Sequence, residues 1–236
     1  MIALAIETSA TPGSVALASE RDGARVVDCA PLLRSAGHAR ALAPAIQELL
    51  SARSLSPSQL DVVVAGMGPG GYTGIRLALA TAKTLAAILP CPIVGVPSTS
   101  VLAAHASVPV GDVLTVLDAK KGDVYGARYK RVEGVAEPTV VEPPFVGPAQ
   151  EVVATLRPGT FVCGDGFGVL AEVHDGPLQG DASLVPRAEE LLSIGVERFL
   201  QGRTDEEKAL LPLYLRPSEA ERRWEERRRE REGRSG

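Results

Sequence analysis

The sequence predicts an α/β protein built from two similar lobes. Short buried strands alternate with helical patterns along the 236 residues, which is typical of this fold class. The first half opens with the apolar run 2–7, which ends in Glu7, and the second half opens with the run 113–118, which ends in Asp118. Because turns and further strands follow both runs in the same order, the pattern indicates a weak internal duplication.

The first half has the predicted order βββαβαβ. Turn residues at 10–13 follow the first strand, and residues 21–23 supply a hairpin turn between the second and third strands. Pro44 interrupts the first helical pattern, so we expect either a kink or a helix that starts later than Ser35. The predicted strands are 2–7, 13–18, 25–29, 61–65 and 93–96, and the predicted helices are 38–50 and 73–89.

The second half repeats this arrangement. Its predicted strands are 113–118, 124–129, 139–142 and 160–163, and its predicted helices are 148–156 and 186–202. We therefore expect a first lobe at residues 1–100, a second lobe at 101–215 and a charged Arg/Glu-rich tail at 216–236.

Composition argues against several classes of protein. The net charge of −4 gives no overall attraction to nucleic acid, so a partner must be identified from local features. The three cysteines lie far apart without a C-x-x-C pair, unlike a disulfide framework or a zinc site. No basic flank of a signal peptide precedes the first apolar run, and no apolar stretch reaches the roughly 20 residues that span a bilayer. We expect a cytoplasmic protein without membrane contact.

A glycine-rich loop precedes the helix 73–89. Gly66, Gly68 and Gly71 satisfy the G-x-G-x-x-G pattern of dinucleotide-binding loops. That pattern also needs an acid about 20 residues further on, and no Asp or Glu occurs in residues 62–111. The lysine that follows the glycines of a P-loop is missing as well. We interpret the glycines as a hinge that permits close backbone packing.

The helix after the loop carries small residues on one face. Gly74, Ala78, Ala82 and Ala86 stand at strict i,i+4 spacing, which lets another element approach closely. Because the helix is apolar almost all round, two of its faces must be covered. One cover is the predicted sheet, and the other is either the helix 38–50 of the same chain or a second chain.

The sequence contains no convincing set of catalytic groups. The three histidines lack the spacing of metal ligands, and no G-x-S-x-G motif marks a nucleophile. We interpret residues 98–100, Ser-Thr-Ser, as the N-cap of a helix that runs to Ala106. Two pairs of carboxylates, Asp118 with Asp123 or Glu7 with Asp118, have the chemistry to bind a metal ion in a cleft between the lobes. Without placed phosphate donors we expect neither a metal nor a cofactor.

Five motifs occur in order along the chain: "LAIETSATPGSVAL", "GPGGYTGIRLALATAKTLA", "GVPSTSVLAAHA", "LDAKKGDVYGARY" and "LPLYLRPSEAE". Together they resemble the bacterial TsaB (YeaZ) family over roughly residues 1 to 220. The second motif is the most specific, and the others support it by their order and spacing.

The resemblance implies an ASKHA (actin, sugar kinase, Hsp70) fold with two βββαβα-type lobes. It also implies a part in forming N6-threonylcarbamoyladenosine (t6A) at position 37 of tRNAs that read codons beginning with A. In the family, TsaD transfers the threonylcarbamoyl group, TsaB is its non-catalytic partner, and the ATPase TsaE joins the complex. We therefore expect an essential accessory subunit that is not itself an enzyme, a heterodimer with TsaD, tRNA contact through the complex, and a homodimer when TsaD is absent.

The related TsaD family differs at the positions that would carry catalysis. TsaD has an H-x-x-x-H metal pair just after the strand that here is 93–96, and the matching residues are Ser98 and Leu102. Neither side chain binds iron or zinc as imidazole does. Where TsaD has a Ser-Gly-Gly phosphate loop, this chain has Asp-Ala-Lys-Lys at 118–121. The resemblance therefore favours the partner over the transferase.

In the family, the first-lobe helices form the surface for TsaD and for the homodimer. The expected interface residues are Leu42, Ile46, Leu49, Gly74, Ile75, Ala78, Ala82 and Ala86. The expected glycine-loop residues form a second group: Gly68, Gly70, Gly71, Thr73 and Arg76. A third group, Glu7 and Asp118, is expected to be what remains of a cleft site. We expect Ala78→Arg to abolish TsaD binding while the monomer stays folded.

Two other hypotheses remain. An actin-like ATPase or small-molecule kinase would use Glu7 and Asp118 in the interlobe cleft, whereas a protease acting on TsaD finds no catalytic triad. The tail from Arg216 holds eight Arg and six Glu, with Glu219–Arg223 and Glu225–Arg229 four residues apart. This spacing favours a solvated helix with salt bridges, and an arginine surface for tRNA phosphates is the alternative.

Overall fold

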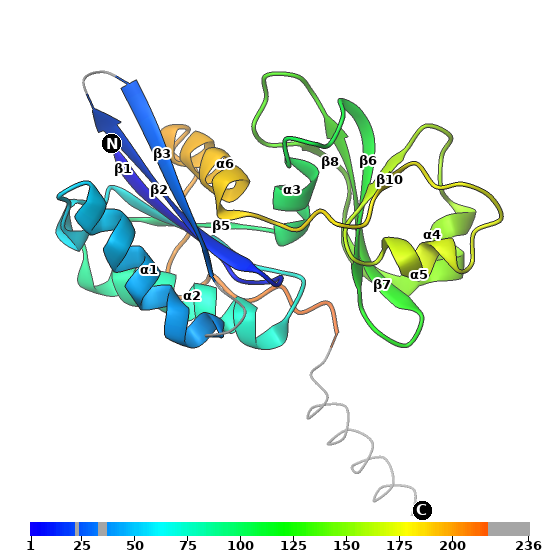
Figure 1. Cartoon of the computed structure of the whole chain (residues 1–236), viewed down its shortest axis with the longest axis horizontal. Coiled ribbons are helices and arrows are strands. Elements are labelled where there is room, and N and C mark those ends of the chain that lie inside the picture. Colours follow the sequence, from blue (N-terminus) through cyan, green and yellow to red (C-terminus); the bar gives the residue numbers. More distant parts are fainter. Residues whose placement is uncertain (22–23, 33–36, 217–236) are drawn as a thin grey trace, which may run out of the picture.

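Two five-stranded sheets, each flanked by helices, make up the protein (Figure 1). The computed structural model describes residues 1–21, 24–32 and 37–216. Residues 22–23 of the hairpin turn predicted at 21–23 and residues 217–236 of the tail predicted at 216–236 lie outside the described residues.

The elements follow the predicted order closely. The first sheet contains β1 (Ile2–Glu7), β2 (Gly13–Arg21), β3 (Ala24–Leu32), β4 (Val62–Gly66) and β5 (Ile93–Val96). Its connections hold α1 (His38–Ala52), the short 3₁₀ helix η1 (Pro57–Gln59) and α2 (Tyr72–Ile88), and α3 (Ser98–Ala103) follows β5. The second sheet contains β6 (Gly111–Asp118), β7 (Asp123–Arg131), β8 (Thr139–Pro148), β9 (Phe161–Cys163) and β10 (Gly180–Asp181). The remaining helices are α4 (Ala149–Ala154), α5 (Phe167–Ala171) and α6 (Ala188–Leu200).

The two sheets share one topology. The first has the order β3-β2-β1-β4-β5, and the second has the equivalent order β8-β7-β6-β9-β10. In each sheet the first three strands are antiparallel, and the last two run parallel to the first strand. The predicted duplication is present, and the predicted α/β fold of ASKHA type with two similar lobes is confirmed.

Alternation along β1 divides the first lobe into two cores. Leu4 and Ile6 belong to the core beneath α1 and α2, whereas Ala3 and Ala5 belong to the core beneath α6. Side chains of a strand point alternately to its two faces, so one six-residue strand serves both layers. The larger residues face the helical pair, and the small alanines allow α6 to pack close to the sheet.

Each half of the chain contributes a helix to the other half's sheet. α6 packs on β1, β2, β4 and β5, although it follows the second sheet in sequence. α3 packs on β6 and β7, although it precedes them. The expected domain 101–215 is therefore divided, because the apolar face of α6 is buried on the first sheet.

The structure corrects the interpretation of residues 98–100. These three residues form the first turn of α3, and Pro97 rather than a serine or threonine stands at the N-cap. The helix ends at Ala103 instead of Ala106. All three side chains are buried, so they are used for contacts inside the protein. The alternative of a late start holds for α1, which begins at His38 and includes Pro44.

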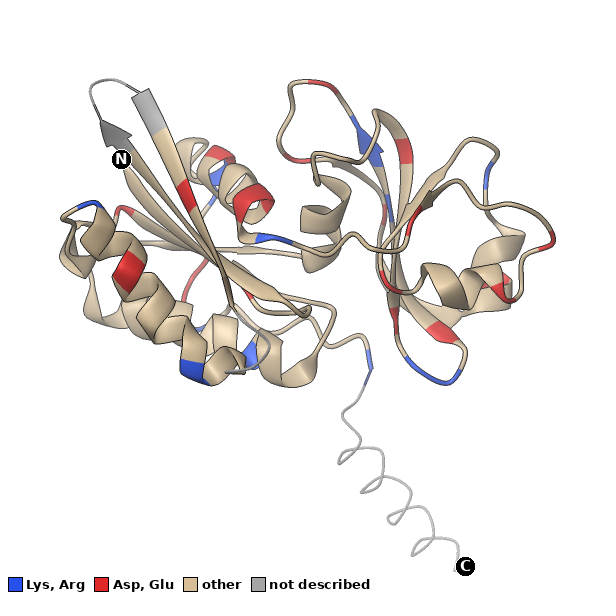
Figure 2. Cartoon of the chain, viewed as in Figure 1, with Lys and Arg blue, Asp and Glu red and all other residues tan. Residues whose placement is uncertain are grey.

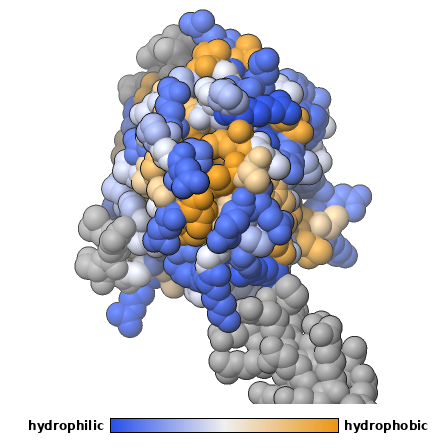
Figure 3. Space-filling model, turned by 90° about the vertical axis from the view of Figure 1, so that its right-hand side faces the viewer, coloured by the Kyte–Doolittle hydropathy of each residue, from blue (hydrophilic) through white to orange (hydrophobic). Residues whose placement is uncertain are grey.

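The outer layer of the second lobe is thin. α4 and α5, which cover this face, are only six and five residues long, and neither β10 nor α5 is predicted by the sequence patterns. Hydrophobic residues gather at the centre of this end of the molecule in Figure 3. Partly buried residues beside the core there include Val153, Leu156, Val169, Val173 and Leu178.

The small-residue face of α2 packs inside the chain. Ala78 and Ala82 are fully buried in the first core, and Ile75 is 1% exposed. A Cβ atom on Gly74 would overlap the carbonyl oxygen of Thr8, and the Thr8 hydroxyl donates a hydrogen bond of 2.6 Å to the Gly74 carbonyl. The element that lies across the stripe is therefore the first sheet with the loop after β1.

This burial overturns the expectation that Ala78→Arg leaves the monomer folded. An arginine at this position would overpack the core and bury an unpaired charge, so we expect the free energy of unfolding to fall by at least about 3 kcal/mol. Urea unfolding followed by circular dichroism measures the change. Ala80→Arg, on the exposed side of α2, is the matched control, and equal stability of the two variants would contradict the burial.

Candidate functional site

Glu7 is completely buried at the carboxyl end of β1, beside the glycine loop. Its Oε1 accepts a hydrogen bond of 2.8 Å from the backbone N–H of Ser9, and its Oε2 accepts one of 2.9 Å from the hydroxyl of Ser98. A side chain on Gly66 would overlap the carboxylate, so glycine makes room for it. Burial raises the pKa of Glu7 and outweighs the hydrogen bonds, which lower it.

Asp118 lies at the equivalent end of β6 and is bound by its own loop. Its carboxylate accepts hydrogen bonds of 2.7 Å from the backbone N–H of Lys120 and 2.5 Å from the Lys120 ammonium. Partial burial raises the pKa of Asp118, but the contacts with Lys120 have the larger combined effect and lower it, so the net shift of the pKa is downward. Glu7 and Asp118 thus each have local partners in this structure.

Protein groups accept hydrogen bonds from two N–H donors of the glycine loop. The N–H of Gly68 donates to the Ser98 hydroxyl at 3.1 Å, and the N–H of Gly71 donates to the Ser9 carbonyl at 2.7 Å. Gly68 and Gly70 have positive φ angles of 87° and 151°, which favour glycine. A Cβ on Gly70 would overlap Ser9. This geometry supports the interpretation of the loop as a close-packed joint.

An aromatic and cationic cluster lies next to the loop. The rings of Tyr72 and Tyr214 stack with centroids 5.0 Å apart, and the guanidinium of Arg76 lies 4.2 Å from the Tyr72 centroid. The Arg76 Nε also donates a hydrogen bond of 2.7 Å to the Tyr214 hydroxyl. Arg76 and Thr73, both expected with the glycine loop, are exposed. This cluster joins α2 to the C-terminal segment, a contact that the sequence patterns do not predict.

An apolar groove runs between α1 and α2 on the outside of the first lobe. Its volume is about 580 Å³. The lining residues are Ala39, Leu42, Ala43, Ile46, Gln47, Leu50, Ser51, Leu55, Ser56, Pro57, Leu77, Thr81 and Leu85. None of these residues is charged, and Figure 2 shows few charged positions along the two helices. A groove of this kind suits an apolar helix face of a partner.

The structure separates the expected interface residues into two groups. Leu42 and Ile46 line the groove. The others, Leu49, Gly74, Ile75, Ala78, Ala82 and Ala86, lie in or against the first core and do not line it.

Sequence reasoning missed most of the groove, although a signal exists. Ala39, Ala43, Gln47 and Ser51 stand at i,i+4 along α1, as do Leu77, Thr81 and Leu85 along α2. These rows lie beside the buried rows, and hydrophobicity alone does not distinguish them.

The described residues show neither a metal cluster nor a membrane-crossing helix. Nowhere in this part of the chain do three His, Cys, Asp or Glu side chains gather as metal ligands would. His38 accepts a hydrogen bond from the N–H of Gly13, and His105 accepts one from the N–H of Ser107. In the same part of the chain, every helix is too short or too polar to span a bilayer.

The buried carboxylate predicts a pH-dependent effect of Glu7→Gln. Because the folded pKa is raised, the stability that Glu7 contributes is full below its unfolded pKa and is lost as pH rises through the folded pKa. The melting temperature of Glu7→Gln minus that of the wild type should therefore increase as pH rises from about 4 to 8. Calorimetric scans across this range measure the difference. Glu48→Gln on the exposed face of α1 controls for loss of one charge, and a pH-independent difference would contradict the prediction.

Comparison with known proteins identifies the family of this chain. A family model described as TsaD, tRNA N6-adenosine threonylcarbamoyltransferase, matches residues 28–159, which is more than half of the chain. The chain is 31% identical to the tRNA threonylcarbamoyladenosine biosynthesis protein TsaB of Bacillus subtilis, over 95% of this chain and 98% of that protein. It is 30% identical to the protein of the same name from Escherichia coli, over 90% and 94% of the two chains.

Solved structures agree with these relatives. The structure described as YeaZ from Pseudomonas aeruginosa superposes with a TM-score of 0.78 at 30% identity, covering 91% of this chain and 99% of that one. A second structure, described as an uncharacterized protein with similarity to peptidase YeaZ from the same organism, has a TM-score of 0.80 with the same identity and coverage. Sequence relatives and structural neighbours agree over nearly the whole length, so this chain contains a TsaD-type domain and belongs to the TsaB (YeaZ) family.

Proposed function

We propose that this chain acts in forming N6-threonylcarbamoyladenosine on tRNA as the non-catalytic partner of TsaD. The observation that carries the proposal is the uncharged groove between α1 and α2, on a lobe that belongs to a TsaB-family chain. An exposed apolar groove lined by two helices is a typical surface for a helix of another subunit. TsaD is the occupant we propose, with a second copy of this chain when TsaD is absent.

The interlobe residues favour this role over catalysis. A kinase or ATPase of the same fold needs free carboxylates for a metal and free N–H donors for phosphate. Here Glu7 binds Ser9 and Ser98, and Asp118 binds Lys120. The N–H groups of Gly68 and Gly71 are used by the protein. Isothermal titration with ATP and magnesium distinguishes the ATPase hypothesis from the partner role. Tight binding or turnover by the isolated chain would favour the ATPase, and the absence of a heat change would support the partner role.

The finer features of the role come from the family. We propose that the modified position is nucleotide 37 of tRNAs that read codons beginning with A, that TsaE joins the complex, and that tRNA is contacted through the complex in the cytoplasm. Reconstituted tRNA modification with and without this chain tests the role directly. Equal t6A formation in both reactions would overturn it.

The groove predicts a binding-deficient variant that still folds. Ala43 is exposed in the middle of α1 and lines the groove. An arginine there would place a charge and a long side chain in the apolar groove. We therefore expect the Kd for TsaD to rise at least about tenfold, which corresponds to about 1.4 kcal/mol. Isothermal titration of TsaD measures the affinity, and urea unfolding verifies the fold.

The matched control makes the same substitution elsewhere. Ala154 is exposed on α4 of the second lobe, and Ala154→Arg should bind TsaD with wild-type affinity. If Ala43→Arg binds TsaD as tightly as Ala154→Arg does, the groove is not the TsaD site. Sedimentation equilibrium of both variants without TsaD tests the homodimer at the same surface.

A further inference from the structure

The segment that follows α6 runs across the first lobe as an extended strap, defined here as residues 201–216. The N–H of Asp205 donates to the Ile93 carbonyl at 2.9 Å, and the N–H of Gly95 donates to the Asp205 carboxylate at 2.8 Å. Further along the strap, Leu210 is buried in the first core. The strap is therefore fixed to the edge strand β5, although it has little regular structure of its own.

The second part of the strap is fixed to the glycine loop and α2. The N–H of Leu213 donates to the Met67 carbonyl at 2.9 Å. Tyr214 then stacks on Tyr72 and accepts the hydrogen bond from Arg76. These contacts hold the strap on the first lobe almost to its end.

Both ends of the strap contact the second lobe. Near its start, the Arg203 guanidinium lies 2.8 Å from the carboxylate of Glu137, in the connection between β7 and β8. At its end, Arg216 forms an ion pair with Asp123 and donates a hydrogen bond of 2.9 Å to the Ala119 carbonyl, at the turn between β6 and β7. The strap thus contacts the second lobe, the first lobe and the second lobe again.

Glu137 connects the strap to α6 as well. The Arg198 Nε, on the last turn of α6, donates to Glu137 at 3.0 Å, and the Arg198 Nη1 donates to the Gly95 carbonyl at 2.7 Å. Burial raises the pKa of Glu137, but the hydrogen bonds from Arg198 and Arg203 lower it more, so the carboxylate stays charged at neutral pH. One carboxylate of the second lobe is therefore held by two arginines of the C-terminal segment.

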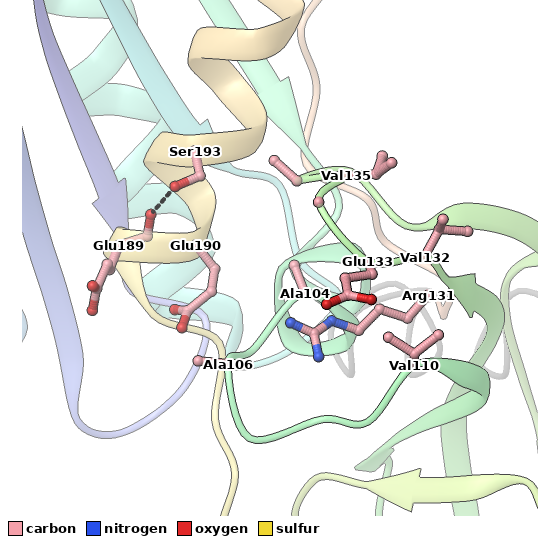
Figure 4. Close-up of a pocket in the computed structure, with 12 residues that line it drawn as sticks. Ala104, Ala106, Val110, Arg131, Val132, Glu133, Val135, Glu189, Glu190 and Ser193 are labelled. Atoms are coloured by element: carbon pink, nitrogen blue, oxygen red, sulfur yellow. Dashed lines mark hydrogen bonds between the residues drawn. The ribbon is translucent and has the colours of Figure 1, made fainter. Parts of the chain in front are cut away.

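Direct packing between the lobes is limited on this side of the molecule. A cavity of about 670 Å³ separates the beginning of α6 from residues 131–136 of the β7–β8 connection. Figure 4 shows Glu189, Glu190 and Ser193 of α6 on one wall, and Arg131 and Glu133 on the facing side. Among the described residues, α3 packs between the lobes, with Val101 in a first-lobe core and Leu102 in a second-lobe core. A contact made by one six-residue helix constrains the angle between two lobes less than a broad packed interface does.

We propose that the strap braces the two lobes at a fixed angle, with its charged ends bound to Glu137 and Asp123 of the second lobe. The two attachment points lie at different connections of the second sheet, Glu137 between β7 and β8 and Asp123 at the turn between β6 and β7. Rotation about α3 would break at least one of them. The inference concerns the chain alone and does not depend on TsaD binding.

Distance measurements between spin labels test the brace. Labels on Glu48→Cys in α1 and Gln150→Cys in α4 report the separation of the lobes, since both sites are exposed and neither lines the groove. The background carries Cys29→Ser, because Cys29 is exposed and Cys91 and Cys163 are buried. Double electron–electron resonance should give one narrow distance distribution for this background protein. In Glu137→Gln/Arg216→Gln the distribution should broaden about twofold or shift, as expected for a released hinge.

Two controls separate bracing from general destabilisation. Glu142→Gln/Arg128→Gln removes an ion pair within the second lobe and should leave the distribution narrow. Asp123→Arg and Arg216→Asp should each broaden the distribution when Glu137→Gln is present, and their combination should narrow it again by restoring an ion pair of opposite polarity. Melting temperatures verify that each variant is folded. A distribution in Glu137→Gln/Arg216→Gln that superposes on the background distribution, or no recovery in the charge exchange, would overturn the brace.

Discussion

The buried carboxylate of Glu7 organises the joint on which the first lobe depends. It links the end of β1 to the beginning of α3 through Ser98, and the same Ser98 hydroxyl accepts the N–H of Gly68 in the glycine loop. A buried carboxyl group is tolerated only when hydrogen bonds satisfy its oxygen atoms. The carboxylate also requires the open backbone of Gly66, since a Cβ atom there would occupy its place. Three connections that are far apart in sequence are thereby fixed at one point.

The joint determines how α2 lies on the sheet and which of its faces remains outside. Gly74 contacts the backbone of Thr8, so the small-residue stripe is pressed against the sheet and the loop after β1. The row that contains Leu77, Thr81 and Leu85 then faces α1 across the groove. The partner surface that we propose is thus a consequence of internal packing: because the small face is held against the sheet, the row of Leu77, Thr81 and Leu85 lines the groove. A glycine loop that resembles a nucleotide site serves here to bring a helix close to a strand.

The two lobes are joined by helices that each half of the chain contributes to the sheet of the other half, rather than by one contact surface. α3 and α6 each pack on the sheet of the other half of the chain, and the strap continues from α6 along the first lobe to the second. In a protein of this fold that binds a ligand between its lobes, movement of the lobes is useful. In a subunit whose proposed work is an interface, a fixed shape lowers the entropy lost on binding. The occupied donors of the glycine loop and the ionic ends of the strap suit this second purpose.

The sequence by itself determined the order of most elements, although not α5 or β10, and also the duplicated βββα pattern, the absence of a nucleotide fingerprint and the family. These features depend on local periodicity and on motifs contiguous in the chain. It did not determine which face of α2 is buried: both rows are apolar, and only the contact of Gly74 with Thr8 decides between them. The sequence also predicted that Ser98 belongs to a helix cap. Its actual hydrogen bond to Glu7 could not be predicted, because the two residues are 91 positions apart in the chain. The placement of α6 on the first sheet and the two ends of the strap were likewise decided by tertiary structure, since long-range packing and ion pairs leave no regular spacing in the sequence.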